Sequence, residues 1–272
     1  MAGAENPGRV ALIAGQGRLP ALLTAHLQAE GRAVTVFAPQ GFTPEGVAAE
    51  LFRFEHLGSL IAGLAAEGYD SVCLAGAARR PRFDPAALDA ATAPLVPRIM
   101  AAMAQGDDGL LRFVIGLFEE AGLQVVGAHE LMPSLVALPP GPAPDAGMQS
   151  DAGRGAAILA ALGPLDVGQA CVVAGGHCLG IETLQGTAAL LDFVARSRGL
   201  LDLPPGGVLV KRSKPGQDLR IDLPAIGPDT LDQATAAGLG GICAEAGRVM
   251  FLDRDRLFAE AEQRGLRIWA SP

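Results

Sequence analysis

Three short apolar runs in the first half of the chain restrict its fold more than any other feature: Arg9–Ala14, Ala33–Phe37 and Ser71–Ala75. Runs of this kind, without a regular polar alternation, are typical of strands in a parallel sheet that is covered on both faces. Amphipathic segments at residues 21–30 and 56–67 separate the runs, so strands and helices alternate. The pattern predicts an α/β protein whose N-terminal domain is Rossmann-like, with a mostly parallel sheet.

The second half of the chain has a different pattern. Two apolar runs, Ala170–Ala174 and His177–Ile181, flank a Gly-Gly pair, which predicts a hairpin with a tight turn. Ile242–Glu245 and Arg248–Leu252 predict a second hairpin, and Thr187 is placed to cap a helix at residues 188–198. Because hairpins are mixed with helices here, we predict a C-terminal α+β domain with a mixed sheet.

Residues 139–155 are crowded with proline, glycine and alanine and show no apolar periodicity. Such a composition is typical of a linker between domains. The chain has 272 residues, which is enough for two domains. We therefore predict an N-terminal domain at residues 1–138, a linker at 139–155 and a C-terminal domain at 156–272.

The overall charge and composition argue against several classes of protein. A formal net charge of −8 disfavours nucleic-acid binding, which needs a basic patch. No apolar run is long enough to span a bilayer, and the first residues lack the charged region of a signal peptide. The cysteines have no metal-binding or redox spacing, so we expect reduced core residues in a cytoplasmic protein; they are Cys73, Cys171, Cys178 and Cys243.

Glycines follow the first and third predicted strands, in Gly15–Gly17 and at Gly76, with Arg80 shortly after. Ligands of open α/β sheets bind beyond the carboxyl ends of the strands, so we expect these loops to face one crevice that could receive nucleotide phosphates. Pro20 stands where the dinucleotide fingerprint needs its third glycine, which argues against a nicotinamide cofactor. The alternative is that the glycines serve only a tight bend.

A block of mixed charge follows the apolar run Val208–Val210 and contains Lys211, Arg212, Lys214, Asp218, Arg220 and Asp222. Cations next to carboxylates suit a phosphate and a divalent ion that are bound together. The alternative is a solvated loop with exposed ion pairs, which stabilise little.

Taken together, these motifs resemble those of the LpxI family of UDP-2,3-diacylglucosamine pyrophosphatases. The resemblance extends over essentially the whole chain, and its most specific part is the K-x-x-K-P-G-Q-D-x-R-x-D-x-P block from Lys211 to Pro224. Gln185 and Ala188 depart from the family's motif, where we expect Glu and Asp. The other stretches that carry the resemblance are Gly15–Pro20, Gly76 with Arg80-Pro81, residues 106–112, Leu165–Gln169, Ile181-Glu182 with Gly186-Thr187, and Glu245–Gly247.

The resemblance implies a homodimeric enzyme of lipid A biosynthesis in a Gram-negative bacterium. It would hydrolyse UDP-2,3-diacylglucosamine to 2,3-diacylglucosamine 1-phosphate (lipid X) and UMP, by attack of water on the α-phosphorus. A divalent cation such as Mg²⁺ or Mn²⁺ would assist. The expected location is the cytoplasm, with peripheral contact at the inner face of the inner membrane, because the substrate carries two acyl chains.

Site residues follow from the resemblance and from the needs of phosphoryl transfer, which are charge stabilisation and an oriented water. We expect Asp222 and Asp218 to bind the metal or activate water, with Glu182 as the third catalytic carboxylate. The residues expected to bind substrate are Gly15, Gln16, Gly17, Gly76, Arg80, Gln169, Thr187, Lys211, Lys214, Gln217 and Arg220.

Two other functions stay open. A sensor that binds a nucleotide sugar without catalysis would explain the missing acids at Gln185 and Ala188. A Rossmann-type oxidoreductase is disfavoured by Pro20 and by the absence of an acidic residue directly after the second predicted strand.

Overall fold

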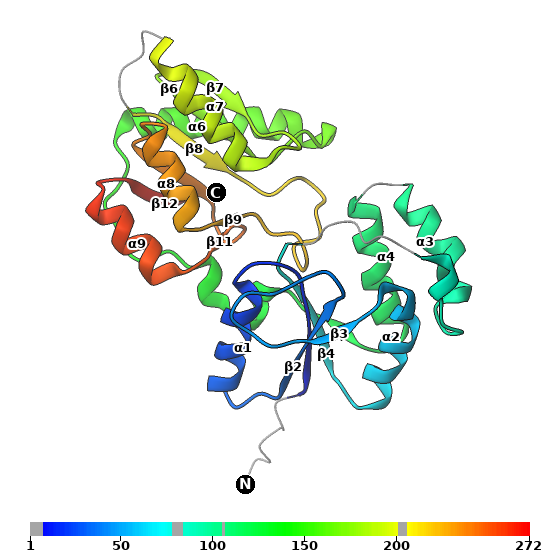
Figure 1. The fold of residues 1–272 in the computed structure, drawn as a ribbon. Helices are drawn as coiled ribbons and strands as arrows, with labels where there is room; N and C mark the ends of the chain where they lie inside the picture. The colour runs from blue at the N-terminus through cyan, green and yellow to red at the C-terminus, as the bar shows by residue number, and fades with distance from the viewer. Residues whose placement is uncertain (1–7, 78–83, 105–106, 201–205) are drawn as a thin grey trace. The chain divides into compact units, whose positions relative to one another are not determined.

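The computed structural model of the chain describes residues 8–77, 84–104, 107–200 and 206–272. It divides into two compact units, Met1–Met132 and Pro133–Pro272 (Figure 1). Within the described ranges, no helix combines the length and the apolar character that a membrane span requires.

The first unit is built on a five-stranded sheet whose strands all run parallel, in the order β3-β2-β1-β4-β5. The central strand β1 pairs with β2 and β4, so that Val10 lies opposite Val34 on one side and Ser71 on the other. This confirms the predicted Rossmann-like, mostly parallel sheet. The strands are β1 (Val10–Ala14), β2 (Val34–Pro39), β3 (Glu50–Phe52), β4 (Ser71–Ala75) and β5 (Gln124–Val125).

Helices of the first unit pack on this sheet through regularly spaced apolar residues. In α1, Leu23 and Leu27 are completely buried, and they are four residues apart on one helix face. Pro20 lies in the first turn, where its missing N–H has no helical partner to lose. The helices are α1 (Leu19–Ala29), α2 (Leu57–Ala66), α3 (Val96–Met103), α4 (Asp107–Glu120) and α5 (Ala128–Leu131).

The second unit contains a mixed five-stranded sheet with the order β12-β10-β8-β6-β7. Strand β6 runs antiparallel to both β7 and β8, whereas β8, β10 and β12 run parallel to one another. This confirms the predicted mixed sheet and the hairpin formed by β6 and β7. The strands are β6 (Ala170–Ala174), β7 (His177–Ile181), β8 (Val208–Lys211), β10 (Gly241–Glu245) and β12 (Arg267–Ser271), and β9 (Ala225–Ile226) pairs separately with β11 (Met250–Phe251).

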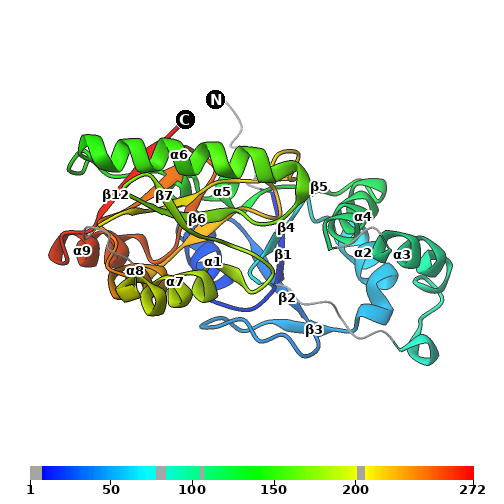
Figure 2. The same cartoon turned by 90° about the horizontal axis from the view of Figure 1, so that it is seen from above.

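Helices cover both faces of the mixed sheet, which explains why its central strands are apolar up to their last residues, Lys211 in β8 and Glu245 in β10. Helix α6 (Ala146–Leu162) lies on one face, and α7 (Gly186–Ser197), α8 (Pro228–Ala236) and α9 (Arg254–Gln263) lie on the other (Figure 2). Val210 packs in the cluster on the α6 side, and its neighbour Leu209 packs in the cluster with α7, α8 and α9. Each fully buried side chain of this type stabilises the fold by about 1.5–3 kcal/mol.

The predicted linker is not free of structure. Helix α6 begins at Ala146, and the Asp145 carboxylate caps it by accepting from the Met148 N–H at 2.9 Å. The predicted helix at residues 156–162 is only the last part of α6. Small residues hide the apolar periodicity because they serve close packing: a Cβ on Gly155 would lie 2.5 Å from Cγ2 of Val210.

The second predicted hairpin is wrong. Strand β10 pairs with β8 and β12, whereas β11 pairs with β9, so Ile242–Glu245 and Arg248–Leu252 do not form a ladder with each other. The short turn between them permits a hairpin, but long-range parallel pairing decides the partners. Cys178 is exposed, in contrast to the prediction that all four cysteines lie in the core, while Cys73, Cys171 and Cys243 are buried and free.

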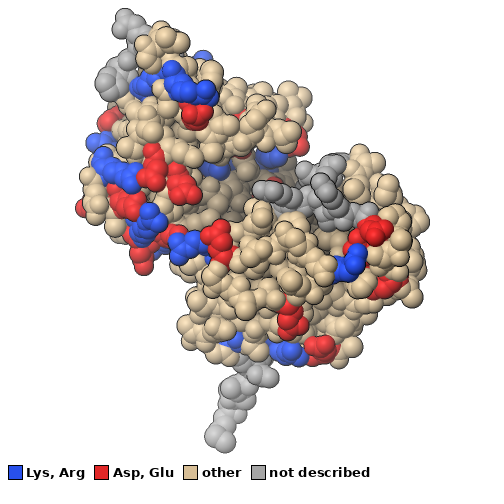
Figure 3. Space-filling model, viewed as in Figure 1, with Lys and Arg blue, Asp and Glu red and all other residues tan. Residues whose placement is uncertain are grey.

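Side chains of opposite charge are interspersed on the face of the molecule drawn in Figure 3. Several oppositely charged side chains are paired along helices, as Arg256 and Glu260 are at 2.6 Å in α9. Such exposed pairs stabilise a helix by only about 0.3–0.5 kcal/mol. On this face, the charged side chains of the described residues form no extended basic patch of the type that marks a nucleic-acid-binding protein.

Candidate functional site

One edge of the mixed sheet collects most of the residues predicted to form the site. Because β6 is antiparallel to its neighbours, its first residue lies beside the last residues of β7 and β8: Cys171 is opposite Ile181, and Ala170 is opposite Lys211. Gln169 therefore precedes β6 at the same edge where Glu182 follows β7. The sheet topology brings together residues that are far apart in the sequence.

Lys211, the last residue of β8, is buried, with 5% of its surface exposed. Its Nζ donates to Thr187 Oγ1 at 2.8 Å, and the Thr187 hydroxyl in turn donates to the Glu182 carboxylate. Burial lowers the pKa of Lys211, and the negative charges of Glu182 and Asp222 oppose that shift. A buried ammonium needs such partners, because an unpaired buried charge is costly.

Thr187 does not have the capping role predicted for it. The residue that precedes α7 is Gln185, and Thr187 lies inside the first turn of the helix with its hydroxyl between Lys211 and Glu182. The predicted grouping of Thr187 with the other site residues is nevertheless what the structure shows. Its hydroxyl has two partners because it can donate and accept at the same time.

Gly168 allows the close approach that holds Glu182 at this edge. The Glu182 N–H donates to the Ala170 carbonyl at 2.8 Å, so the chain beyond β7 folds against the start of β6. A Cβ on Gly168 would lie 2.0 Å from the Glu182 carbonyl oxygen, a distance that no side chain can accept. Glu182 is itself buried, with 7% exposure, and is not a surface acid.

Gln217 links the two ends of the charged loop. Its side-chain oxygen accepts from the Lys214 N–H at 2.9 Å, and its amide donates to the Asp222 carboxylate. The Asp222 N–H donates to the Asp218 carbonyl at 3.2 Å, which closes a turn. Asp222 is exposed, so its carboxylate is held in place and remains accessible to a ligand.

Asp218 and Arg220 form a local ion pair. Arg220 Nε lies 3.0 Å from Asp218 Oδ1, and Nη2 lies 2.7 Å from Oδ2, so the guanidinium contacts both carboxylate oxygens. The Arg220 N–H adds a bond of 3.1 Å to Oδ1. Among the residues that the structure describes, no group of three or more His, Cys, Asp or Glu side chains is arranged to hold a metal ion.

Lys214 has a more exposed partner. Its Nζ lies 2.6 Å from Oδ1 of Asp166, whose side chain is 75% exposed and whose backbone has a left-handed φ of 54°. An exposed pair of this kind stabilises the fold by about 0–1 kcal/mol. The Lys214 ammonium can therefore exchange Asp166 for a phosphate oxygen at little cost.

Gln169 carries an unsatisfied acceptor. Its carbonyl oxygen accepts from the Arg212 N–H at 2.9 Å, but the side-chain Oε1 is buried without a hydrogen-bond partner among the described residues. A buried acceptor without a partner costs about 1–3 kcal/mol. This supports the predicted place of Gln169 in a binding site, where a donor from a ligand would satisfy it.

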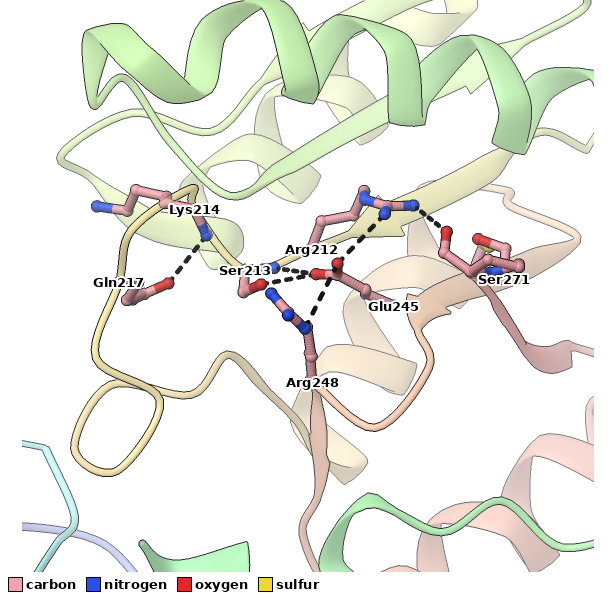
Figure 4. Close-up of polar contacts among 9 residues, drawn as sticks. Arg212, Ser213, Lys214, Gln217, Glu245, Arg248 and Ser271 are labelled. Atoms are coloured by element: carbon pink, nitrogen blue, oxygen red, sulfur yellow. Dashed lines mark hydrogen bonds and ion pairs between the residues drawn. The ribbon is translucent and has the colours of Figure 1, made fainter.

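Glu245 at the end of β10 contributes a contact that the sequence reasoning missed. Figure 4 shows Arg212, Ser213 and Arg248 converging on its carboxylate, next to Lys214 and Gln217. The Ser213 N–H and hydroxyl donate to Oε2 at 2.8 and 2.7 Å, and Arg212 Nη2 lies 3.2 Å from Oε1. The sequence signal for this contact was an acidic residue at the end of an apolar strand, β10, which pairs with another apolar strand, β8.

The glycine loops of the first unit lie against each other. The Gln16 N–H donates to Ala77 O at 2.8 Å, and the Ala77 N–H donates back to Gln16 O at 2.9 Å. A Cβ on Gly15 would lie 2.5 Å from Ala77 O, and one on Gly76 would lie 2.7 Å from Gln16 O. The contact between the loops thus explains both glycines, while Arg80 lies outside the described residues.

Gly17 differs from these two glycines. Its φ of 87° lies in the left-handed region that favours glycine, and a Cβ there would meet nothing within 4 Å. Space next to Gly17 is therefore open, as a phosphate-binding loop requires. The left-handed backbone conformation alone is also enough to explain why a glycine is present at this position.

Comparison with known proteins gives matches to both units. The LpxI N-terminal domain matches residues 9–135, and the LpxI C-terminal domain matches residues 140–269. A protein named UDP-2,3-diacylglucosamine pyrophosphatase LpxI, from Caulobacter vibrioides, is 38% identical over 277 aligned positions, which cover 95% of each chain.

A solved structure gives a much weaker likeness. A short-chain dehydrogenase/reductase superfamily protein from Agrobacterium tumefaciens with bound NAD is 22% identical, and the match covers 42% of this chain and 30% of that one. The TM-score of 0.25 is too low to bear on fold or function.

Proposed function

This chain belongs to the LpxI family, and from that membership we propose that it hydrolyses UDP-2,3-diacylglucosamine to 2,3-diacylglucosamine 1-phosphate and UMP. The enzyme class is then a hydrolase that acts on a diphosphate bond. The observation that carries the proposal is the buried Lys211, which is held by Thr187 and Glu182 at the start of a loop that ends in an exposed carboxylate, Asp222.

Lys211 and Lys214 bind the diphosphate in this proposal. Lys211 is a fixed charge with low exposure, so its attraction to an anion is only weakly screened. Lys214 exchanges its exposed partner Asp166 for a phosphate oxygen. Arg220, held by Asp218, adds a planar cation that suits the negative charge developing in the transition state.

A divalent cation such as Mg²⁺ fits the donors that are present. Mg²⁺ commonly uses one or two carboxylates and takes its other ligands from water and substrate phosphates. Asp222 suits this role better than Asp218, because Asp222 is exposed and the Asp218 oxygens contact the Arg220 guanidinium. When bound, the cation would neutralise phosphate charge next to Lys211.

Asp222 and Glu182 are the two carboxylates proposed to orient water. Water attacks the α-phosphorus, and its oxygen forms the new bond. The bond from the α-phosphorus to the bridging oxygen breaks, and that oxygen leaves with the sugar 1-phosphate. Gln217 fixes the Asp222 carboxylate through its amide, and this limits the orientations that the carboxylate can adopt.

The family resemblance supports two further proposals. The protein forms a homodimer, and it contacts the inner membrane peripherally in order to reach a substrate with two acyl chains. Neither depends on the residues of the site.

A sensor that only binds a nucleotide sugar is the second candidate. The observation in its favour is that Gln185 and Ala188 replace expected acids. Both positions are exposed, and the Gln185 side chain contacts Thr183. Thr187, which contacts the buried lysine, and Glu182, which accepts from the Thr187 hydroxyl, are both retained. This favours the enzyme.

The test is turnover of UDP-2,3-diacylglucosamine by the purified protein with Mg²⁺ and with EDTA, with products identified by mass spectrometry. The proposal expects UMP and the sugar 1-phosphate in equal amounts with Mg²⁺ and much less with EDTA. Binding of substrate without formation of product would instead support the sensor. Equal rates of hydrolysis with and without EDTA would exclude a role for the divalent cation.

A further inference from the structure

Glu245 has no role in the chemistry proposed above, yet its carboxylate makes several close contacts with the phosphate-binding segment. Oε2 accepts from the N–H and the hydroxyl of Ser213, at 2.8 and 2.7 Å. Oε1 lies 3.2 Å from Arg212 Nη2 and 4.0 Å from Arg248 Nε. The Glu245 side chain is 14% exposed, so water screens these contacts poorly.

The position of Glu245 follows from the sheet. Strand β10 runs parallel to β8, with Ala244 opposite Lys211. The next residue of each strand, Glu245 and Arg212, then lies at the same level just beyond the ladder. An acid at this point reaches the segment that leaves β8 without distorting either strand.

The backbone of that segment is fixed at three successive residues by three different acceptors. The Arg212 N–H donates to Gln169 O at 2.9 Å, and the Ser213 N–H donates to the Glu245 carboxylate at 2.8 Å. The Lys214 N–H donates to the Gln217 side chain at 2.9 Å. The middle bond joins the segment to the end of β10, so Glu245 holds the backbone of the segment close to that strand.

We infer that Glu245 is a positioning residue that sets where Lys211 and Lys214 present their charges to the diphosphate. The inference rests on the proposed function, because the two lysines are the substrate-binding cations of that proposal. Ser213 lies between them, and its N–H and hydroxyl are both held by one carboxylate. The same carboxylate engages Arg212, which also donates to the Pro272 oxygen at 2.8 Å, so the Arg212 charge is directed away from the ligand.

Steady-state kinetics can distinguish a positioning role of Glu245 from a role in stabilising the fold alone. If Glu245 only stabilised the fold, its loss would reduce the fraction of active protein, which lowers the apparent kcat and leaves KM unchanged. If it positions the cations that bind the diphosphate, its loss weakens binding and raises KM. A misplacement of about 1 Å in such a group costs up to roughly a hundredfold.

The experiment compares Glu245→Ala and Glu245→Gln with wild type and with Glu262→Ala, an exposed acid on α9 in the same unit. We expect KM for UDP-2,3-diacylglucosamine to rise about tenfold to a hundredfold in Glu245→Ala, with a smaller change in kcat. Glu245→Gln keeps one acceptor for Ser213, so its KM is expected to lie between those of wild type and Glu245→Ala. KM of Glu245→Ala within about twofold of wild type would overturn the inference.

Ser213→Ala keeps the test valid if the Glu245 variants fail to fold. It removes one bond to the carboxylate and leaves the strands intact, so KM is expected to rise severalfold; an unchanged KM would overturn the inference.

Affinity for UDP, measured by calorimetry, separates this inference from the proposed function. Wild type that fails to hydrolyse the substrate contradicts the proposed function. In that case weaker UDP binding by Glu245→Ala than by Glu262→Ala supports the positioning role, and equal binding overturns it.

Discussion

The ammonium of Lys211 lies 2.8 Å from the hydroxyl of Thr187, and this contact joins the end of β8 to the first turn of α7. The same hydroxyl donates to Glu182, so one small polar side chain connects a buried cation to a buried carboxylate. In a medium of low polarity, two linked hydrogen bonds of this kind hold both charged side chains in place, with little freedom to move.

Replacement of Thr187 by valine keeps the shape and removes the hydroxyl. Lys211 and Glu182 then lose their bridge, and we expect kcat/KM to fall by roughly tenfold to a hundredfold and the free energy of unfolding to fall by about 1–3 kcal/mol. Steady-state kinetics and urea unfolding measure the two effects. Thr235→Val is the matched control, because that hydroxyl donates to the Leu231 carbonyl within its own helix, α8, at 2.8 Å. Equal activities of the two variants would contradict the role of Thr187.

The pH dependence of activity should report the buried lysine. Burial lowers the pKa of Lys211, so its positive charge is lost at a pH below the ordinary lysine value of 10.5. We therefore expect kcat/KM to fall on the alkaline side with an apparent pKa below that value. Lys211→Arg retains its charge throughout, because a guanidinium stays protonated, and the fall should move to higher pH. The same alkaline profile in both proteins would exclude Lys211 as its source.

The lowered pKa also predicts how stability changes with pH. Between the folded and the ordinary pKa of Lys211, the unfolded chain binds more protons at this residue than the folded chain. Stability therefore gains from this group as pH rises through that range, and the gain is lost again as pH falls through the folded pKa. In Lys211→Met this contribution is absent. Urea unfolding of both proteins at several alkaline pH values should show a more positive slope of stability with pH in wild type, and equal slopes would contradict the prediction.

Two aspartates of the charged loop should behave differently. Asp222→Asn is expected to lower kcat by roughly 10²–10³ while the protein stays folded, because the accessible carboxylate is lost. Asp218→Asn removes the negative charge that faces the Arg220 guanidinium and should mainly raise KM. Kinetics and circular dichroism of both variants check this, with Asp255→Asn as a control at a fully exposed site. A kcat for Asp222→Asn near that of wild type would rule out its proposed role.

Gly168→Ala tests the support of Glu182. The added Cβ would lie 2.0 Å from the Glu182 carbonyl oxygen, so the two loops must separate. Overpacking of this type costs about 1–3 kcal/mol, and displacement of Glu182 should lower activity as well. Gly199→Ala is the control, because a Cβ there meets nothing within 4 Å. If both variants unfold at the same urea concentration and turn over equally, the close approach does not matter.

The strands of both sheets could be predicted where an apolar run was buried on both faces, as in Ser71–Ala75 and Ala170–Ala174. The pairing partners of the strands could not be predicted in the same way. The two apolar runs around the Ala246-Gly247 turn carry no information on which distant strand each run joins. Strand β12 was missed because its apolar run is only three residues long, between Arg267 and Ser271, at a sheet edge. In α6, Gly155 interrupts the apolar periodicity because this position packs closely on Val210.

The site could be predicted as a set of residues but not as a network. The spacing of Lys211, Asp218 and Asp222 showed charges in one loop, and the pairing of Asp218 with Arg220 depends on how that loop turns. Glu245 lies next to Ser213 only because β10 is the neighbour of β8. Such contacts arise from strand order, which periodicity does not encode.

Hydrolysis in ¹⁸O-labelled water tests the central claim most directly. The purified protein is incubated with UDP-2,3-diacylglucosamine and Mg²⁺, and both products are analysed by mass spectrometry. Attack of water on the α-phosphorus predicts one ¹⁸O atom in UMP and none in 2,3-diacylglucosamine 1-phosphate. Label in the sugar phosphate would contradict the proposed attack, and no products at all would contradict the proposed reaction.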